Sequence, residues 1–420
     1  MNTRHGIPDT LVLLGLLIFA PTFASAATYF ITPSGSDSNS GTQASPFATI
    51  QKAHDVAVAG DTIYLRGGIY NLNSLGQTVL TRDGSSGNHI KLFNYPGELP
   101  VLDGISVTNQ FLYPLFMNSA SWWHIKGLEI KNGPFVSIEI AGDSSNNIIE
   151  GNNIHHGGRL AVVGSGIRVT GAAAHNLFLN NDFHHQRDTT GGSNADGISL
   201  SGVSGSGNVL RGNRSWRNGD DGFDLWNSVA VTMENNWAWE NGFDDALNPL
   251  GDGNGFKLGG SGSGDGGHTL RNNVAWKNKA RGFDQNAADI GITLYNNTGW
   301  SNPWGNYQFP TGSHVYTNNI SFEPGGADNR SGTSTTNNWQ VGTTTSADFV
   351  TLAWTANTGA RQADGSLPVS TFLHLVSGSD LIDKGVDVGI AYSGNAPELG
   401  AYEYVGSVPP PPAPPPPPPP

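Results

Sequence analysis

The central part of the chain repeats a short pattern in which a few apolar, β-favouring residues lead into one or two asparagines. Seven such phrases end at Asn153, Asn181, Asn213, Asn236, Asn273, Asn297 and Asn319, at steps of 28, 32, 23, 37, 24 and 22 residues. A minimum near 22 residues with variable insertions is typical of a solenoid whose coils hold three short strands each. The pattern therefore predicts an all-β fold, a right-handed parallel β-helix.

The repeated asparagine also predicts a ladder inside this solenoid. Asparagine tolerates the left-handed backbone of a tight turn, and its amide can bond to its copy one coil away. Stacked coils lie about 4.8 Å apart, so identical amides can form a continuous column. Ordinary surface turns of a β-sandwich are the alternative, but seven matching phrases favour the solenoid.

A second column repeats the pattern glycine-apolar-polar. It comprises Gly166-Ile167-Arg168, Gly197-Ile198-Ser199, Gly222-Phe223-Asp224, Gly255-Phe256-Lys257 and Gly282-Phe283-Asp284. Because neighbours along a strand point to opposite sides, we expect the apolar residue in the core and the polar ones outside. The residues before the last four glycines, Asp196, Asp221, Asn254 and Arg281, form another polar column beside it.

The two ends have a different composition from the repeats. Arg4 and His5, an apolar stretch from Leu11 to Ala20 and the small residues Ala24-Ser25-Ala26 predict a signal peptide over residues 1–26. A membrane anchor is the alternative, but this apolar stretch is shorter than a span of about 20 residues. Residues 408–420 are almost pure proline and predict a polyproline II linker or tail.

One catalytic β-helix domain, residues 27–407, is expected between these ends. The segment from Gly35, with a short helix over 51–58, is interpreted as one terminal cap. The pattern fades beyond Ser321, and the following segment is interpreted as a cap over the other end of the solenoid.

Composition narrows the class of function. The 420 residues carry 21 Lys and Arg against 34 Asp and Glu, a net charge of −13, and no cysteine. The acidic balance argues against general nucleic-acid binding, yet it permits a polyanionic substrate if a cation mediates. The lack of cysteine removes disulfides, thiolate zinc sites and cysteine nucleophiles together.

Four aspartates cluster once the coils are stacked. Asp196 lies 24 residues, or one coil, before Asp220, and Asp221 and Asp224 follow at once. Like charges so close are unfavourable unless a cation compensates them. Ligation by oxygen alone favours Ca²⁺ over zinc, so the set predicts a calcium site. Solvated aspartates in separate turns are the alternative.

Lys257 follows Asp224 in the next coil of the same column. A lysine beside a bound dication is pushed toward the neutral amine, so Lys257 is a candidate base. The negative charge of Asp284 would instead favour the protonated amine of Lys257. A salt bridge of Lys257 to Asp224 or Asp284 is the structural alternative. Arg281 could clamp a substrate carboxylate with two parallel hydrogen bonds.

A uronate sugar suits this combination of groups. Ca²⁺ that bridges enzyme and substrate carboxylates neutralises the carboxylate on C5 and acidifies the C5 proton. An amine then removes this proton, and the C4–O glycosidic bond is expelled. This is β-elimination, which consumes no water and leaves a 4,5 double bond.

At these residues the chain resembles polysaccharide lyase family nine, the pectate lyases. The likeness rests on the coils Asn-Ala-Asp196-Gly, Asp220-Asp221-Gly-Phe-Asp224 and Asn-Gly-Phe-Lys257, and it spans roughly residues 27–403. It implies a right-handed parallel β-helix with a long asparagine ladder, and Ca²⁺ bound by Asp196, Asp220, Asp221 and Asp224. It also implies Lys257 as the base and polygalacturonate (pectate) as the substrate of a secreted enzyme.

One departure from that pattern is an acidic insertion with Asp244, Asp245 and Asp252. It lies between Asp224 and Lys257 in the chain, and we expect it beside the cleft, where it could alter subsites or bind more Ca²⁺. The exact polymer and the endo or exo mode therefore stay open. We expect no nucleic-acid or membrane partner, and a monomer is the default for a capped solenoid.

Three other functions stay open at this stage. An alginate lyase or C5-epimerase would need a neutralised carboxylate and a base as well; the histidines His155, His156, His184 and His185 are the residues to examine for an acid/base pair. A polygalacturonase-like hydrolase would use paired carboxylates and consume water. A carbohydrate-binding solenoid could use a strip of tryptophans, namely Trp216, Trp237, Trp239, Trp276, Trp300 and Trp304.

Overall fold

The computed structural model describes residues 26–260, 263–404 and 406. Residues 1–25 of the expected signal peptide and all of the proline-rich segment 408–420 lie outside the described residues, so both boundaries stay predictions. Within the described part, no helix has the length and hydropathy needed to cross a membrane.

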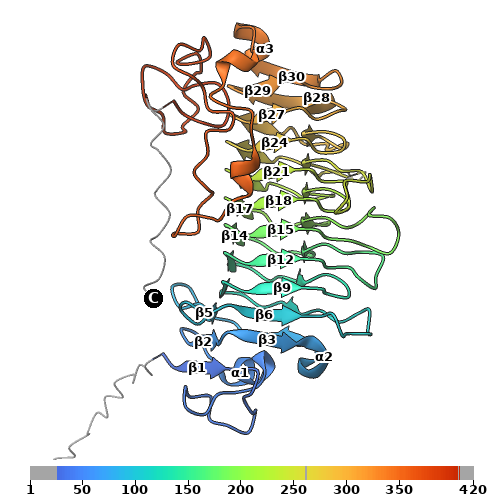
Figure 1. Cartoon of the computed structure of the whole chain (residues 1–420), viewed down its shortest axis with the longest axis vertical. Coiled ribbons are helices and arrows are strands. Elements are labelled where there is room, and N and C mark those ends of the chain that lie inside the picture. Colours follow the sequence, from blue (N-terminus) through green and yellow to red (C-terminus); the bar gives the residue numbers. More distant parts are fainter. Residues whose placement is uncertain (1–25, 261–262, 405, 407–420) are drawn as a thin grey trace, which may run out of the picture.

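The chain winds into a stack of coils, and most coils give one short strand to each of three faces (Figure 1). Strands of successive coils pair in parallel, as β16 (Ile198–Leu200) does with β19 (Phe223–Asp224) and β19 with β22 (Phe256–Lys257). We name the faces A, B and C in the order in which a central coil visits them, as in Ile138–Ala141, Ile148–Glu150 and Asn153–His155.

Face A contains β4 (Thr78–Leu80), β7 (Leu115–Asn118), β10 (Ile138–Ala141), β13 (Ile167–Val169), β16 (Ile198–Leu200), β19 (Phe223–Asp224), β22 (Phe256–Lys257) and β25 (Phe283–Asp284). Face B contains β1 (Thr28–Ile31), β2 (Thr62–Leu65), β5 (Ile90–Asn94), β8 (Trp123–Lys126), β11 (Ile148–Glu150), β14 (Leu177–Leu179), β17 (Val209–Arg211), β20 (Thr232–Glu234), β23 (Thr269–Arg271) and β26 (Thr293–Tyr295). The longer β28 (Tyr307–Thr317) and β30 (Asn329–Thr335) extend across both faces.

Face C is a separate ten-stranded sheet. It contains β3 (Gly68–Asn71), β6 (Pro100–Asp103), β9 (Glu129–Lys131), β12 (Asn153–His155), β15 (Asp182–His184), β18 (Arg214–Trp216), β21 (Trp237–Trp239), β24 (Val274–Trp276), β27 (Thr298–Trp300) and β29 (Ile320–Phe322). The predicted all-β parallel solenoid is therefore confirmed.

Side-chain hydrogen bonds join the predicted asparagines into a ladder inside the solenoid. For example, Asn213 Nδ2 donates to Asn236 Oδ1 at 3.0 Å, and Asn236 Nδ2 donates to Asn273 Oδ1 at 2.9 Å. The ladder runs through Asn152, Asn181, Asn213, Asn236, Asn273, Asn297, Asn319 and Asn337. The ladder is confirmed with one correction: the first phrase contributes Asn152 instead of Asn153, which already begins β12.

The two asparagines of a pair have different tasks. The first takes the left-handed conformation that turns the corner, with φ of 57° at Asn180 and 56° at Asn235. The second lies in the ladder. Glycine takes the first place at Gly151 and Gly212, where φ is 61° and 66°. A tight corner followed by a buried amide explains why the pair recurs.

The glycines of the second column are required by close packing. A Cβ on Gly222 would lie 2.7 Å from Asn241 Nδ2 and 2.7 Å from the Gly255 carbonyl oxygen. Asn241 belongs to a second ladder at the corner between faces C and A, which the sequence analysis missed. Its members are Gln186, Asn218, Asn241, Asn278, Asn302 and Asn306.

Aromatic side chains stack inside the solenoid directly behind face A. The ring centroids of Phe223 and Phe256 are 4.8 Å apart, those of Phe256 and Phe283 are 4.8 Å apart, and Tyr307 continues the stack at 5.1 Å. These rings are fully buried. The stack fixes the backbone that carries Asp224, Lys257 and Asp284, since each follows one of the phenylalanines.

Short helices cover the two ends. The helix predicted over 51–58 is present as α1 (Ile50–Val56), and α2 (Leu72–Leu75) follows β3. At the other end α3 (Asn338–Val341) places Trp339 against Tyr307 and Tyr316. Two 3₁₀ turns, Ser346–Asp348 and Thr355–Thr358, come next.

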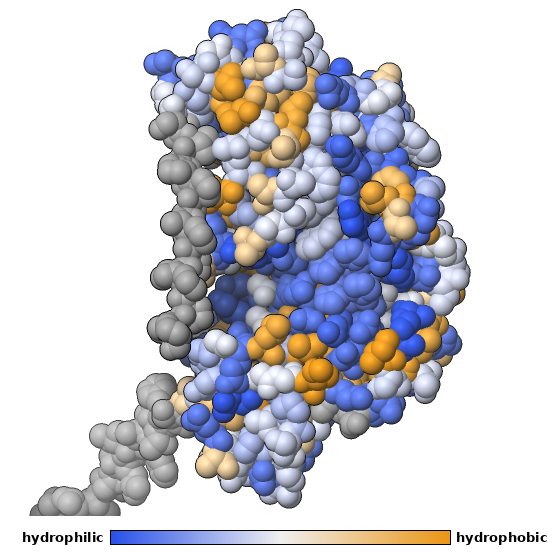
Figure 2. Space-filling model, in the orientation of Figure 1, coloured by the Kyte–Doolittle hydropathy of each residue, from blue (hydrophilic) through white to orange (hydrophobic). Residues whose placement is uncertain are grey.

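The expected C-terminal cap departs from the prediction in its position. After α3 the chain returns along face C instead of only covering the open end (Figure 1). Arg361 bonds Asp182 of β15, and Phe372 packs 5.1 Å from Trp276 of β24. Figure 2 shows that apolar residues on the visible side of the molecule gather in small, separate patches between hydrophilic ones.

Asn236→Ala tests the ladder. It removes the acceptor for Asn213 and the donor to the Leu210 carbonyl, and both lost hydrogen bonds are buried. We therefore expect a loss of at least about 3 kcal/mol in the free energy of unfolding. Asn235→Gly is the matched control and should be tolerated, because glycine already stands at this place in two coils. Denaturant unfolding checks both variants, and equal losses would contradict the division of tasks.

Candidate active site

The polar residues of face A form one outward column in register. Cross-strand partners are Arg168 with Ser199, Ser199 with Asp224, Asp224 with Lys257, and Lys257 with Asp284. The predicted neighbourhood of Asp224 and Lys257 is therefore present.

The column before the glycines is also in register. Gly197 N donates to the Asp221 carbonyl at 3.0 Å, and Gly222 N donates to the Asn254 carbonyl at 2.9 Å. Asp196 thus stands one coil from Asp221, and Asp220 lies one residue farther into the turn. The steps between coils differ because insertions leave at the turns. The expected 24-residue step from Asp196 to Asp220 is therefore one residue too short, since Asp221 is the residue in register with Asp196.

The structure brings the four predicted aspartates together. Carboxylate oxygens of Asp196, Asp221 and Asp224 lie within 4.8 Å of one another, as do those of Asp220, Asp221 and Asp252. All four predicted aspartates are buried. Asp252, from the acidic insertion, is exposed, and its backbone N–H donates to Asp220 Oδ1 at 2.6 Å.

Hydrogen bonds hold these carboxylates but leave lone pairs open. Asp221 Oδ1 accepts from the backbone N–H and the side-chain amide of Asn254 at 2.6 and 2.9 Å. Asp224 Oδ1 is buried with no hydrogen-bond partner among the described residues, whereas the buried Asp221 Oδ2 forms an ion pair with Lys257 Nζ at 3.1 Å. Converging oxygens with open lone pairs fit a hard divalent cation such as Ca²⁺.

Lys257 lies against this cluster. Its Nζ is 3.1 Å from Asp221 Oδ2, 3.8 Å from Asp224 Oδ2 and 4.0 Å from Asp252 Oδ2. Burial lowers the pKa of Lys257, but the charges of the aspartates, Asp221 first, outweigh it and raise that pKa above its usual value. Without a metal, Lys257 is therefore an ammonium group held by carboxylates.

Burial and mutual repulsion raise the pKa values of Asp196, Asp220 and Asp224 in the metal-free protein. Burial, helped by the charges of Asp221 and Asp196, raises the pKa of Asp220 to about 9. Burial raises the pKa of Asp224 to about 7, although the charge of Lys257 lowers it. The pKa of Asp196 is raised as well, by burial first and then by Asp224. A bound cation would compensate the same charges.

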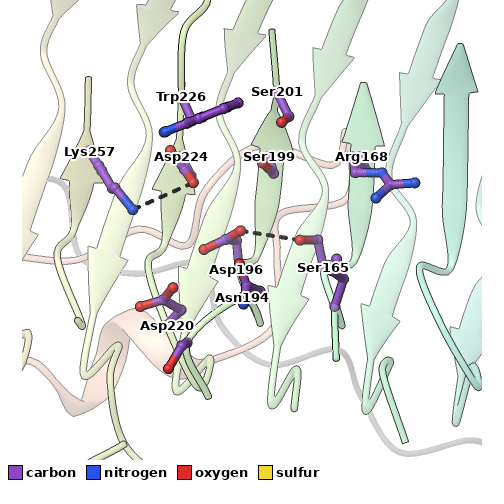
Figure 3. Close-up of a pocket in the computed structure, with 12 residues that line it drawn as sticks. Ser165, Arg168, Asn194, Asp196, Ser199, Ser201, Asp220, Asp224, Trp226 and Lys257 are labelled. Carbon is purple, nitrogen blue, oxygen red and sulfur yellow. Dashed lines mark hydrogen bonds and ion pairs between the residues drawn. The ribbon is translucent and has the colours of Figure 1, made fainter. Parts of the chain in front are cut away.

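A pocket of about 270 Å³ opens over these residues on face A (Figure 3). Its wall includes Asp196, Asp220, Asp224 and Lys257. It also includes residues that the sequence analysis did not select as site residues, namely Ser165, Arg168, Ser199, Ser201 and Trp226. Trp226, two residues after Asp224, is 41% exposed. Its place after the Gly-Phe-Asp motif could have indicated it.

Arg281 lies in the column, but it is tied to a neighbour. Its Nη1 donates to Asp284 Oδ2 at 2.9 Å, and its guanidinium lies 5.5 Å from the Trp304 ring. Asp284 is thus paired with Arg281, and the nearest carboxylates of Lys257 are Asp221 and Asp224. The sequence left open whether Lys257 pairs with Asp224 or with Asp284, and the bond of Asp284 to Arg281 favours Asp224.

The residues of the other expected functions lie elsewhere. The rings of His155 and His184 stack with each other on face C, and Trp216, Trp239 and Trp276 continue the same stack. Of the tryptophans considered as a sugar-binding strip, Trp304 is the one that is more than half exposed. None of these residues lines the pocket on face A.

Comparison with known proteins gives concordant matches. The family model described as "Pel9A-like, right handed beta helix region" matches residues 29–337. Pectate lyase L of Paenibacillus polymyxa (strain SC2) is 37% identical over 393 residues, which cover 88% of this chain and 86% of the relative. The right-handed description agrees with the predicted handedness.

Two solved structures are similar over most of their length. The crystal structure of pectate lyase Pel9A has a TM-score of 0.81 at 30% identity and covers 90% of this chain and 97% of that chain. A rhamnogalacturonan lyase has a TM-score of 0.73 at 28% identity and covers 84% of this chain and 97% of that chain.

The raised aspartate pKa values predict how metal-free stability depends on pH. Asp220, with a folded pKa of about 9, keeps a proton that the unfolded chain loses near its ordinary pKa of about 3.9. Between these two pKa values Asp220 is protonated in the folded state and ionised in the unfolded state, so this group makes the free energy of unfolding fall as the pH rises to about 9. Unfolding midpoints in chelator at several pH values check this. Asp220→Asn should flatten the slope, and a slope unchanged by this variant would contradict the assignment.

Proposed function

The chain belongs to the Pel9A-like right-handed β-helix family and is a polysaccharide lyase, and we propose that it is a Ca²⁺-dependent pectate lyase that cleaves polygalacturonate by β-elimination. The observation that carries the proposal is the single amine of Lys257 beside converging, partly unpaired carboxylates at a pocket on face A. Secretion is part of the proposal and rests on the N-terminal sequence pattern.

In this proposal Asp196, Asp220, Asp221 and Asp224 hold the Ca²⁺. The oxygen-only donor set and the unpaired Oδ1 of Asp224 support this choice of ion. When bound, Ca²⁺ supplies positive charge that neutralises the substrate carboxylate and the aspartates around Lys257, which lowers the pKa of the C5 proton and of the amine.

Lys257 is the proposed base. Its Nζ accepts the C5 proton, and the electron pair of the C5–H bond forms the double bond between C4 and C5 as the C4–O bond breaks. The departing oxygen receives a proton from solvent. The aspartates keep the amine in place, since three of their oxygens lie within 4.0 Å of Nζ.

Arg281 is proposed to bind substrate at the far side of Lys257. Its pairing with Asp284 leaves other N–H donors of the guanidinium for a carboxylate, since arginine carries five. Arg281 itself is not among the residues that line the pocket on face A. The exposed ring of Trp226 does line this pocket and offers an apolar surface to a sugar.

Rhamnogalacturonan is a second candidate substrate. The observation in its favour is the 28% identity to a rhamnogalacturonan lyase over 84% of the chain. That polymer also contains uronate residues, so the same proton abstraction applies to it. Activity on each polymer separates the two substrates.

The first test is ultraviolet absorbance of an unsaturated uronide formed from polygalacturonate at mildly alkaline pH. We expect the absorbance to rise with Ca²⁺ and to stop rising with chelator. New reducing ends without absorbance would indicate a hydrolase. Absorbance with rhamnogalacturonan alone would move the substrate to that polymer, and absence of product from any uronate polymer would overturn the lyase.

Two variants separate the base from the metal site. Lys257→Ala should lower kcat by at least about 10²-fold and keep Ca²⁺ affinity, because the amine acts on the proton. Asp224→Ala should weaken Ca²⁺ binding first, measured by calorimetry. Lys277→Asn, an exposed corner lysine, is the control and should behave as wild type. Near-normal turnover by Lys257→Ala would show that the base is another group.

A further inference from the structure

The pocket on face A extends beyond the proposed catalytic group toward the N-terminal end of the solenoid. Lys257 lies at one end of the pocket and Arg168 at the other, with Asp196 between them (Figure 3). Arg168 is in register with Ser199, and Ser199 with Asp224, so Arg168 stands two coils from Asp224. At the usual spacing of paired strands this is about 10 Å along the axis.

Arg168 is held in place by contacts within the protein. Its Nε donates to Glu139 Oε2 at 2.8 Å, and its guanidinium lies 5.1 Å from the centre of the Phe135 ring. The side chain keeps 23% of its surface exposed. Glu139 and the Tyr113 side chain use part of the five N–H donors of Arg168, and the remaining N–H groups can donate to a ligand.

We propose that Arg168 forms a second carboxylate-binding subsite, which takes the carboxylate of a uronate residue other than the one that is cleaved. The inference rests on the proposed function. A polyuronate lying along face A passes Lys257, the aspartate cluster and then Arg168. Of the twelve residues lining the pocket, Arg168 and Lys257 are the two cations, and Lys257 is engaged by Asp221 and Asp224.

This position predicts a specific kinetic signature. A carboxylate bound there is remote from the bonds that change, so it is held equally well before and in the transition state. Loss of such uniform binding raises KM and leaves kcat nearly unchanged. The subsite thereby selects polymers with a free carboxylate on the flanking sugar.

The test is Arg168→Ala with polygalacturonate and with partially methyl-esterified pectate. On polygalacturonate we expect KM to rise about 10- to 100-fold, the loss of one charged bidentate contact, with kcat retained. On the esterified substrate the ratio of variant to wild-type KM should shrink. An unchanged KM, or the same ratio on both substrates, would overturn the subsite.

Two further variants guard against a merely structural effect. Arg168→Ala leaves the buried Glu139 without its partner, so Glu139→Gln/Arg168→Ala should restore stability and still show the raised KM. Arg211 makes the same kind of cross-coil bond, to Glu234 at 2.8 Å, on face B. Arg211→Ala is the matched control, and an equal rise in KM there would contradict the proposal.

Binding without turnover separates this inference from the proposed function. In the Lys257→Ala background, calorimetry with a saturated trigalacturonate and Ca²⁺ should give an affinity that falls about 10- to 100-fold when Arg168→Ala is added. If wild type forms no unsaturated product but this fall is seen, the lyase fails and the subsite stands. If product forms and affinity does not fall, the subsite fails alone.

Discussion

Buried backbone groups at the corners of the coils are the constraint on which the rest of this structure depends. A parallel solenoid must turn its chain at every corner, and a buried N–H or C=O there has to find a partner inside the molecule. Asparagine ladders supply these partners, because each amide bonds both to its neighbour in the ladder and to backbone. A shorter ladder of Asn147, Asn176 and Asn208 does the same at the corner between faces A and B. Such bonds require one amide at the same place in each coil.

The fixed register of the corners carries over to face A. Glycine before each strand lets the backbone approach the second ladder. The stacked phenylalanines that follow fix the backbone of the next residue. The residue after the phenylalanine then points outward at a repeating position. Asp224, Lys257 and Asp284 therefore stand in line whatever the length of the insertions between them.

The same register places four aspartates so close together that their negative charges repel one another. Asp196, Asp220, Asp221 and Asp224 are buried together, and the pKa values of Asp220 and Asp224 are raised to about 9 and about 7. The amine of Lys257 compensates part of this charge. Further positive charge from a cation would compensate the aspartates and leave the amine less firmly protonated, so metal binding and base function belong to one charge balance.

The sequence by itself determined the solenoid, the ladder, the glycine column and the stacking of Asp224 on Lys257, because a repeated residue type at a repeated corner is a local property of the chain. It missed the second ladder, since Asn218, Asn241 and Asn278 follow residues of varied type, and it misplaced the first rung at Asn153. Only the tertiary structure decided that Asp221 is the nearest partner of Lys257, that Arg281 pairs with Asp284, and that Arg168 and Trp226 share the pocket. These outcomes depend on distances between side chains of different coils, which variable insertions and side-chain rotamers set and no periodicity encodes.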